Sequence, residues 1–249
     1  MHRFFVEKHQ IIGDTIQILG TDVKHIKDVI RLKQGEKIEI SSEGITYICE
    51  IELLSKGKIL AKIIDKREGT NEAPIHIVLY QGLAKGNKMD LIIQKTTEIG
   101  VKEIYPVATN RSIVKINDIK KEQSKVERWS SIADEAAKQS KRDILPKVHN
   151  IISFDEMVML LKDEQNILVP YENEKANSMN DKLKNITNKT NKIHLIIGPE
   201  GGFEDIEIKK LKSIGGQIIT LGPRILRTET AGIVAATIIL YELGDLGVI

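Results

Sequence analysis

Two short apolar runs, each broken by a Gly-Pro pair, constrain the fold of this chain more than any other feature. The first run lies in His194-Leu-Ile-Ile-Gly-Pro-Glu-Gly-Gly-Phe203, and the second leads into Leu221-Gly-Pro-Arg-Ile-Leu-Arg-Thr-Glu-Thr-Ala-Gly232. A short apolar run bounded by turn residues is typical of a buried strand in a parallel sheet. Both runs therefore predict buried parallel strands of an α/β fold whose carboxyl ends open into neighbouring sharp loops, and ligands bind at the carboxyl ends of such strands.

The composition of the two loops indicates how they would bind a ligand. Glycine lets backbone N–H and C=O groups approach a ligand closely, whereas proline stiffens the turn and removes a donor. The glycines are not followed by Lys-Ser/Thr and do not form G-x-G-x-x-G, so neither phosphate-binding motif is present. One such loop alone is typical of an ordinary strand-to-helix turn. Two of them predict one pocket that recognises a flat, neutral ring through the backbone.

The 249 residues are enough for a small domain and a medium one. The first 70 or so residues predict strands at 37–40, 46–51 and 58–64 and a helix from Asp22 that stops near Gly35, which favours a small β-barrel. Residues 65–74 have the polar composition of a linker, and alternating strands and helices follow them. We therefore expect a barrel domain over 1–72 and an α/β domain over 73–249.

The second domain shows a regular alternation of strand and helix patterns. Strands are predicted at 75–80, 103–108, 166–170, from Ile193 onward and at 217–221; helices are predicted at 88–99, 120–139, 204–214 and 228–243. Ser153 and Glu156 have the spacing of a capping box that opens one more helix. The polar segment 172–192 is typical of a mobile surface connection outside the site.

Charge and cysteine content exclude several classes of protein. The 37 Lys and Arg against 35 Asp and Glu leave a net charge of only +2, so a nucleic-acid site must be local. Scattered histidines and the single Cys49 support neither a metal site nor disulfides. Residues 1–7 lack the long apolar region typical of a signal peptide, and the longest apolar run, 231–241, is too short to span a bilayer. We expect a soluble cytoplasmic protein with no membrane partner.

Three ordered segments resemble the bacterial small-subunit (16S) rRNA uridine-N3 methyltransferase family of the SPOUT class. They are Ile197–Phe203, Leu221–Ala231 and the upstream Lys85-Gly-Asn-Lys-Met-Asp-Leu-Ile-Ile-Gln-Lys-Thr-Thr-Glu-Ile-Gly-Val101. The resemblance covers most of 75–249, while the N-terminal part is similar only loosely. It implies a C-terminal SPOUT α/β domain with a deep trefoil knot, a small PUA-like β-barrel that binds RNA, a homodimer and S-adenosylmethionine as methyl donor.

The resemblance also implies which residues form the site. In the family the donor is held by three loops, which here follow Val169, Ile197 and Leu221. The implied cofactor contacts are Ile197, Gly198, Glu200, Gly201, Leu221, Gly222 and Leu226, and a poorer match in the first loop adds Tyr171 and Glu172. Packing in the core is the alternative for Leu221 and Leu226.

Three charged residues are candidates for catalysis. A guanidinium fork suits anionic phosphates, so Arg227 is expected to grip RNA near the methyl donor, with an ion pair to Glu229 as its competing role. Glu200 and Glu229 are candidate general bases for the N3 proton. The alternative is that Thr228 or Thr230 caps the last helix and Glu229 complements its positive end.

Further basic residues are candidates for RNA contact, although such residues often only form a solvated face. The segments 111–115 and 139–142 resemble family segments near the active face. The candidates are Lys88, Arg111 and Arg142, together with Arg3 and Arg31 of the small domain. Aromatic residues are only 4% of the chain, so shape and phosphate contacts should dominate recognition.

The function expected from the resemblance is S-adenosylmethionine-dependent methylation of uridine N3 in 16S rRNA of the small ribosomal subunit. The alternatives are a SPOUT methyltransferase that acts on another RNA atom and a non-enzymatic ribosome-assembly factor that binds RNA, because fold alone does not select the chemistry. The helix predicted at 228–243 is apolar nearly all round, more than one core-facing stripe requires. This surplus favours the homodimer.

Overall fold

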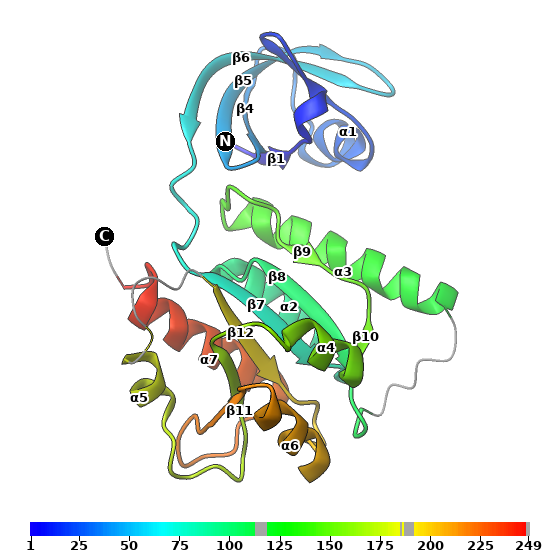
Figure 1. Cartoon of the computed structure of the whole chain (residues 1–249). Coiled ribbons are helices and arrows are strands. Elements are labelled where there is room, and N and C mark those ends of the chain that lie inside the picture. The colour runs from blue at the N-terminus through cyan, green and yellow to red at the C-terminus, as the bar shows by residue number, and fades with distance from the viewer. Residues whose placement is uncertain (113–118, 185, 187–191, 248–249) are drawn as a thin grey trace. The chain divides into compact units, whose positions relative to one another are not determined.

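The chain divides into two compact units in the computed structural model, which describes residues 1–112, 119–184, 186 and 192–247 (Figure 1). The first unit comprises Met1–Glu72 and Ala137–Leu145, and the second comprises Ala73–Ala136 and Pro146–Ile249. Residues 137–145, which comprise the last three residues of the helix at 119–139 and the segment after it, thus belong to the first unit by their contacts.

A six-stranded sheet with the order β1-β4-β5-β6-β3-β2 forms the first unit. Its elements are β1 (Arg3–Phe5), the 3₁₀ helix η1 (Lys8–Gln10), β2 (Ile11–Ile12), β3 (Thr15–Ile18), β4 (Lys37–Ser42), β5 (Ile45–Leu54) and β6 (Ile59–Glu68). The three predicted strands are confirmed as β4, β5 and β6, and each is longer than predicted. Alternate residues such as Ile38, Ile40 and Ile51 are fully buried, as expected for strands with one face on a core.

The helix predicted from Asp22 is confirmed at its start but not in its form or its end. It begins as α1 (Thr21–Lys24) and continues as a π-helix, η2 (His25–Ile30), and both Val23 and Ile26 are buried in the core of the unit. Arg31 then adopts a left-handed conformation with φ 62°, so the helix ends at Ile30, five residues before Gly35. A left-handed backbone at an arginine is strained, and such strain is common at functional positions.

A buried polar network joins residues 137–145 to the sheet of the first unit. Asp143 accepts hydrogen bonds from Arg3 Nη1 at 2.7 Å, from Thr46 Oγ1 at 2.8 Å and from the Asn71 N–H at 2.7 Å. Arg142 Nη2 forms an ion pair with Glu72 Oε2 at 2.7 Å. Burying these charges is tolerable only because each is paired.

The expectation that Arg3 and Arg142 contact RNA is therefore wrong. Their exposed fractions are 4% and 2%, and both guanidinium groups bind carboxylates within the first unit. A group held in this way cannot turn outward to a phosphate without breaking a buried ion pair. The sequence alone does not reveal this, because the residues next to a basic side chain do not show whether it is paired with a distant carboxylate or exposed to solvent.

The second unit is a parallel sheet with helices on both faces. The order is β10-β8-β7-β12-β11-β13, and β9 pairs with β8. The strands are β7 (His76–Gly82), β8 (Glu103–Ala108), β9 (Lys147–Val148), β10 (Ile152–Ser153), β11 (Ile167–Pro170), β12 (Lys192–Ile197) and β13 (Gln217–Ile219); the helices are α2 (Lys88–Ile99), α3 (Ile119–Gln139), α4 (Phe154–Leu161), α5 (Met179–Lys184), α6 (Asp205–Ser213) and α7 (Thr228–Leu243).

Most of these elements match the sequence patterns. The helix predicted at 88–99 is α2, and Gly100 ends it in the left-handed conformation. The capping box of Ser153 and Glu156 is present at the start of α4. Most of the segment 185–191 lies outside the described residues, but Met179 and Leu183 of α5 are buried in the core.

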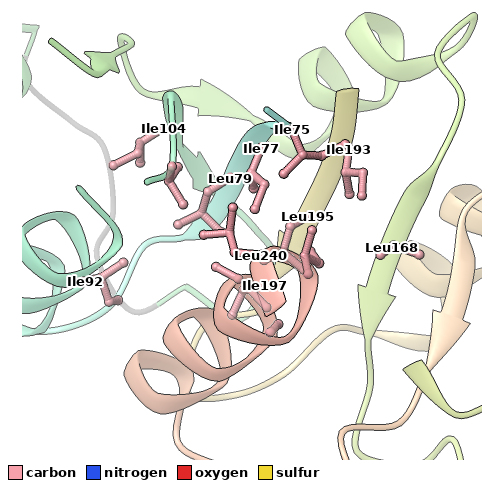
Figure 2. Packing of buried hydrophobic residues seen from close by; sticks show 14 of the residues in the cluster. Ile75, Ile77, Leu79, Ile92, Ile104, Leu168, Ile193, Leu195, Ile197 and Leu240 are labelled. Atoms are coloured by element: carbon pink, nitrogen blue, oxygen red, sulfur yellow. The ribbon is translucent and has the colours of Figure 1, made fainter. Parts of the chain in front are cut away.

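Both faces of the sheet are buried, which explains why its strands read as continuous apolar runs. Ile77 and Leu79 of β7 point to the face covered by α2 and α7, where they meet Leu195, Ile197 and Leu240 (Figure 2). Val78 and Tyr80 point to the opposite face, which holds residues of α4 and α6. Within the described part of the chain, no helix combines the length and apolarity that crossing a membrane requires.

Asp143→Ala should destabilise the first unit. It would leave the buried Arg3 guanidinium without its 2.7 Å partner, and removing one member of a buried ion pair costs about 3–5 kcal/mol. Hydrogen exchange of the amides in β4–β6 under increasing urea measures this change. As a control, Asp155→Ala removes an exposed ion pair with Lys210 and should cost less than about 1 kcal/mol. Equal protection in both variants would contradict this role of Asp143.

Candidate functional site

A cavity of about 540 Å³ lies in the second unit, where the loops after β11, β12 and β13 meet. Its lining residues come from these loops, from α2 and from the start of α7: Lys88, Pro170, Tyr171, Glu172, Ile197, Gly198, Pro199, Glu200, Gly202, Phe203, Thr220, Leu221, Gly222, Pro223, Arg224, Ile225, Leu226, Arg227, Thr228 and Ala231. The loops follow the carboxyl ends of parallel strands, the usual ligand site of α/β folds.

The two strands that lead into the Gly-Pro loops are parallel, as predicted, but they are not adjacent in the sheet. β11 lies between them, with Leu168 paired to Leu195 of β12 and Val169 paired to Ile218 of β13. The two Gly-Pro loops nevertheless line the same cavity, and the loop after β11 joins them. The loop with the weakest sequence pattern is thus the central one.

Most of the residues predicted to contact a cofactor come together at this cavity. Ile197, Gly198, Glu200, Leu221, Gly222 and Leu226 all line it, as do Tyr171 and Glu172. Gly201 is not among the lining residues. Its carbonyl accepts a hydrogen bond from Arg111 Nη1 at 3.1 Å, so it connects the loop to the segment after β8.

Two glycines show why these loops need residues without a side chain. Gly222 has φ +117°, and a Cβ there would meet no atom within 4 Å, so backbone conformation rather than space selects glycine. At the end of β7, a Cβ on Gly82 would lie 2.5 Å from the Pro199 nitrogen. Gly82 therefore permits close contact between the central strand and the first Gly-Pro loop.

Thr228 connects the last helix to the first loop rather than capping the helix. The N-cap residue is Arg227, and its side chain makes no capping hydrogen bond. The Thr228 hydroxyl donates to the Gly198 carbonyl at 2.5 Å and accepts a hydrogen bond from Gln81 Nε2 at 2.9 Å. The capping role expected for Thr228 is wrong because its hydroxyl is used between elements.

A cluster of charges lies at one side of the cavity. Lys88 Nζ donates to Glu200 Oε1 at 2.9 Å and lies 3.7 Å from Glu229 Oε2. Partial burial raises the pKa of Glu200, but hydrogen bonds from Lys88 and from the Lys85 N–H outweigh burial and hold this pKa below its usual value. The hydrogen bond to Glu200 raises the pKa of Lys88. The Lys88–Glu200 pair is therefore ionised at neutral pH.

The three catalytic candidates differ in their surroundings. Glu200 Oε1 already accepts two hydrogen bonds, whereas Glu229 Oε2 is buried and has no hydrogen-bond donor among the described residues. Arg227 lines the cavity and is exposed. The ion pair of Glu229 is made with Lys88, so the alternative pair with Arg227 is not formed.

The remaining RNA candidates are in different settings. Lys88 is bound to Glu200 within the cavity, and Arg111 is exposed although it donates to Gly201. Arg31 is exposed in the first unit. Lys115, the last residue of the segment 111–115 that resembles a family segment, lies outside the described residues.

Sequence reasoning missed several residues of the site. Phe203 and Thr220 border the Gly-Pro segments, and the glycine pattern alone could have pointed to them. Gln81 is fully buried in β7, and only the fold brings it to Thr228.

Comparisons with known proteins agree with this geometry. The family described as RNA methyltransferase domain matches residues 71–240, and the RNA methyltransferase PUA domain matches residues 18–64. Ribosomal RNA small subunit methyltransferase E of Bacillus subtilis is 37% identical and aligns over 97% of each chain. The protein of the same name from Mesomycoplasma hyopneumoniae is 34% identical over 95% of this chain and 98% of its own.

A solved structure of a protein with the same name has a similar fold. Ribosomal RNA small subunit methyltransferase E from Neisseria gonorrhoeae, crystallised bound to S-adenosyl methionine, superposes with a TM-score of 0.85 at 29% identity over 99% of both chains. Its near-complete overlap covers both units of the present structure. The chain therefore belongs to the ribosomal RNA small subunit methyltransferase E family of RNA methyltransferases.

Proposed function

We propose that this protein transfers a methyl group from S-adenosylmethionine to N3 of a uridine in 16S rRNA of the small ribosomal subunit. The observation that carries the proposal is the single cavity formed by the two Gly-Pro loops and the loop after β11. Support comes from relatives named for methylation of small-subunit rRNA and from a relative crystallised with S-adenosyl methionine.

The residues present suit S-adenosylmethionine. A cavity of about 540 Å³ is of the size that encloses a small organic ligand. Its backbone at Gly198 and Gly222 can approach an adenine ring, and Leu221 and Leu226 offer apolar surface to it. Glu172 and Arg224, also in the lining, offer charges that complement the ammonium and carboxylate of the methionine part.

The chain itself must orient the uracil and free the lone pair of N3. S-adenosylmethionine, when bound, supplies a methyl group on a positively charged sulfur. Arg227, exposed at the cavity, is suited to bind a phosphate and to stabilise the deprotonated uracil ring. Glu229 is the better proton acceptor of the two carboxylates, because Glu200 already accepts two hydrogen bonds.

The expected domain roles, knot and dimer belong to the same proposal. The PUA match supports RNA binding by residues 1–72, with Arg31 on a phosphate, and Arg111 is the candidate from the second unit. A deep trefoil knot accords with β11 lying between β12 and β13 in the sheet. The exposed apolar side chains of Ile225 and Tyr241 support a homodimer.

The reaction product tests the proposed function most directly. Small subunits from cells that lack this gene should gain one N3-methyluridine in 16S rRNA when incubated with the purified protein and S-adenosylmethionine. Mass spectrometry of the digested RNA measures the product. A methyl group on a ribose or on another base atom would instead favour a SPOUT enzyme with a different target, and no methylation would favour an assembly factor.

Gly222→Ala should weaken binding of S-adenosylmethionine. Its φ of +117° strains any other residue by about 1 kcal/mol or more. Relief of this strain should shift the backbone of a loop that lines the cavity. The matched control is Gly215→Ala, since Gly215 also has positive φ and open space but does not line the cavity. Calorimetric titration should show weaker binding for the first variant only. Equal affinities of the two variants for S-adenosylmethionine would argue against binding of the donor in this cavity.

Arg227→Ala should reduce methylation while leaving donor binding nearly intact. Loss of a charge-assisted contact with RNA or with the ionised base costs about 2–4 kcal/mol, or roughly 30- to 1000-fold in kcat/KM. Arg227→Lys keeps the charge without the fork and should recover only part of the rate. A wild-type kcat/KM in Arg227→Ala would exclude the role.

A further inference from the structure

A chain of hydrogen bonds joins three elements at the edge of the cavity. Gln81 at the end of β7 donates to the Gly82 carbonyl at 3.0 Å and to the Thr228 hydroxyl at 2.9 Å through the same nitrogen. Thr228, the first residue of α7, donates in turn to the Gly198 carbonyl at 2.5 Å. We call Gln81, Thr228 and the carbonyls of Gly82 and Gly198 the relay.

The direction of the relay is fixed by its two ends. A backbone carbonyl only accepts hydrogen bonds, so the Gln81 amide must present its NH₂ group to Gly82. The second hydrogen of that group then points at the Thr228 oxygen, and the Thr228 proton is left for Gly198. Reversing the amide would place its oxygen against the Gly82 carbonyl.

Burial makes the relay costly to disturb. Gln81 is fully buried and Thr228 is 6% exposed, so water does not readily replace a lost partner. Gln81 Oε1 has no hydrogen-bond partner among the described residues, and it lies close to Gly232, where a Cβ would be 3.3 Å away. A buried oxygen without a donor destabilises the fold, and an apolar side chain at this position would avoid that cost. The presence of Gln81 therefore calls for an explanation.

We propose that Thr228 is a positioning residue of the methyl-donor site, and that Gln81 acts through it. Gly198 and Thr228 both line the cavity, Gly198 in the loop after β12 and Thr228 as the first residue of α7, directly after the loop that follows β13. The Thr228 hydroxyl therefore fixes the distance between the two Gly-Pro loops. This inference depends on the proposed function, because it assigns the cavity to S-adenosylmethionine.

The test is a set of variants titrated with S-adenosylmethionine in the full-length protein. Thr228→Val keeps the shape but removes the hydroxyl, and its dissociation constant should rise about 5- to 30-fold. Thr228→Ser retains the hydroxyl and should bind within about twofold of wild type. Thr237→Val is the matched control, because Thr237 lies on the same helix but does not line the cavity. Its hydroxyl donates a hydrogen bond of 2.8 Å to the Ile233 carbonyl.

Gln81→Met provides a second arm that does not depend on the folding of Thr228→Val. Without the donor, the Thr228 hydroxyl is free to turn from Gly198, so affinity should fall as in Thr228→Val. In the double variant the loss should not exceed that of the worse single variant by more than about twofold, since both break one relay. Melting temperatures separate this effect from general destabilisation.

The outcomes distinguish the relay from the proposed function. Binding by Thr228→Val within about twofold of wild type, failure of Thr228→Ser to restore affinity, or additive losses in the double variant would each overturn the relay. Absence of S-adenosylmethionine binding by the wild-type protein would overturn the proposed function instead.

Discussion

The parallel direction of the strands in the second unit is the constraint on which the rest of the site depends. Because β7, β11, β12 and β13 all run the same way, their carboxyl ends meet at one edge of the sheet. Burial of both faces holds these strands in register, so the loops that follow them inherit a fixed spacing. The cavity is the space that remains between these loops and the start of α7.

Close backbone contact turns that edge into a shaped site. Gly82 lets the Gly198-Pro199 bend rest against the central strand, and Gly222 takes up a conformation that other residues adopt only with strain. Thr228 then joins the bend to the last helix. These main-chain positions shape the cavity at the two Gly-Pro loops, which suits recognition of an uncharged ring.

The sequence predicted the elements well wherever local chemistry decides them. Gly100 and the Ser153–Glu156 capping box mark helix ends through contacts within a few residues, and both are confirmed. The position of β11 between the two Gly-Pro strands could not be predicted, because it depends on how distant segments cross. The same reason conceals the contact between Gln81 and Thr228.

Charge was the least predictable property. Nothing in the sequence distinguishes Arg3 and Arg142 from surface arginines, yet both are buried in the first unit, where Arg3 binds the buried Asp143 and Arg142 binds the partly buried Glu72. Arg227 and Arg31 are also arginines, but both are exposed. Only the position of an acidic partner far along the chain separates the two groups, and a single sequence does not give that position.

We propose that the cavity between the two Gly-Pro loops holds the methyl donor through main-chain groups. A crystal structure of this protein with S-adenosylmethionine would show directly where the donor binds. The adenosyl group should lie between the loops after β12 and β13, with its ring edge hydrogen-bonded to backbone atoms of these loops. A donor bound outside this cavity, or held there only by side chains, would exclude main-chain recognition by the two loops.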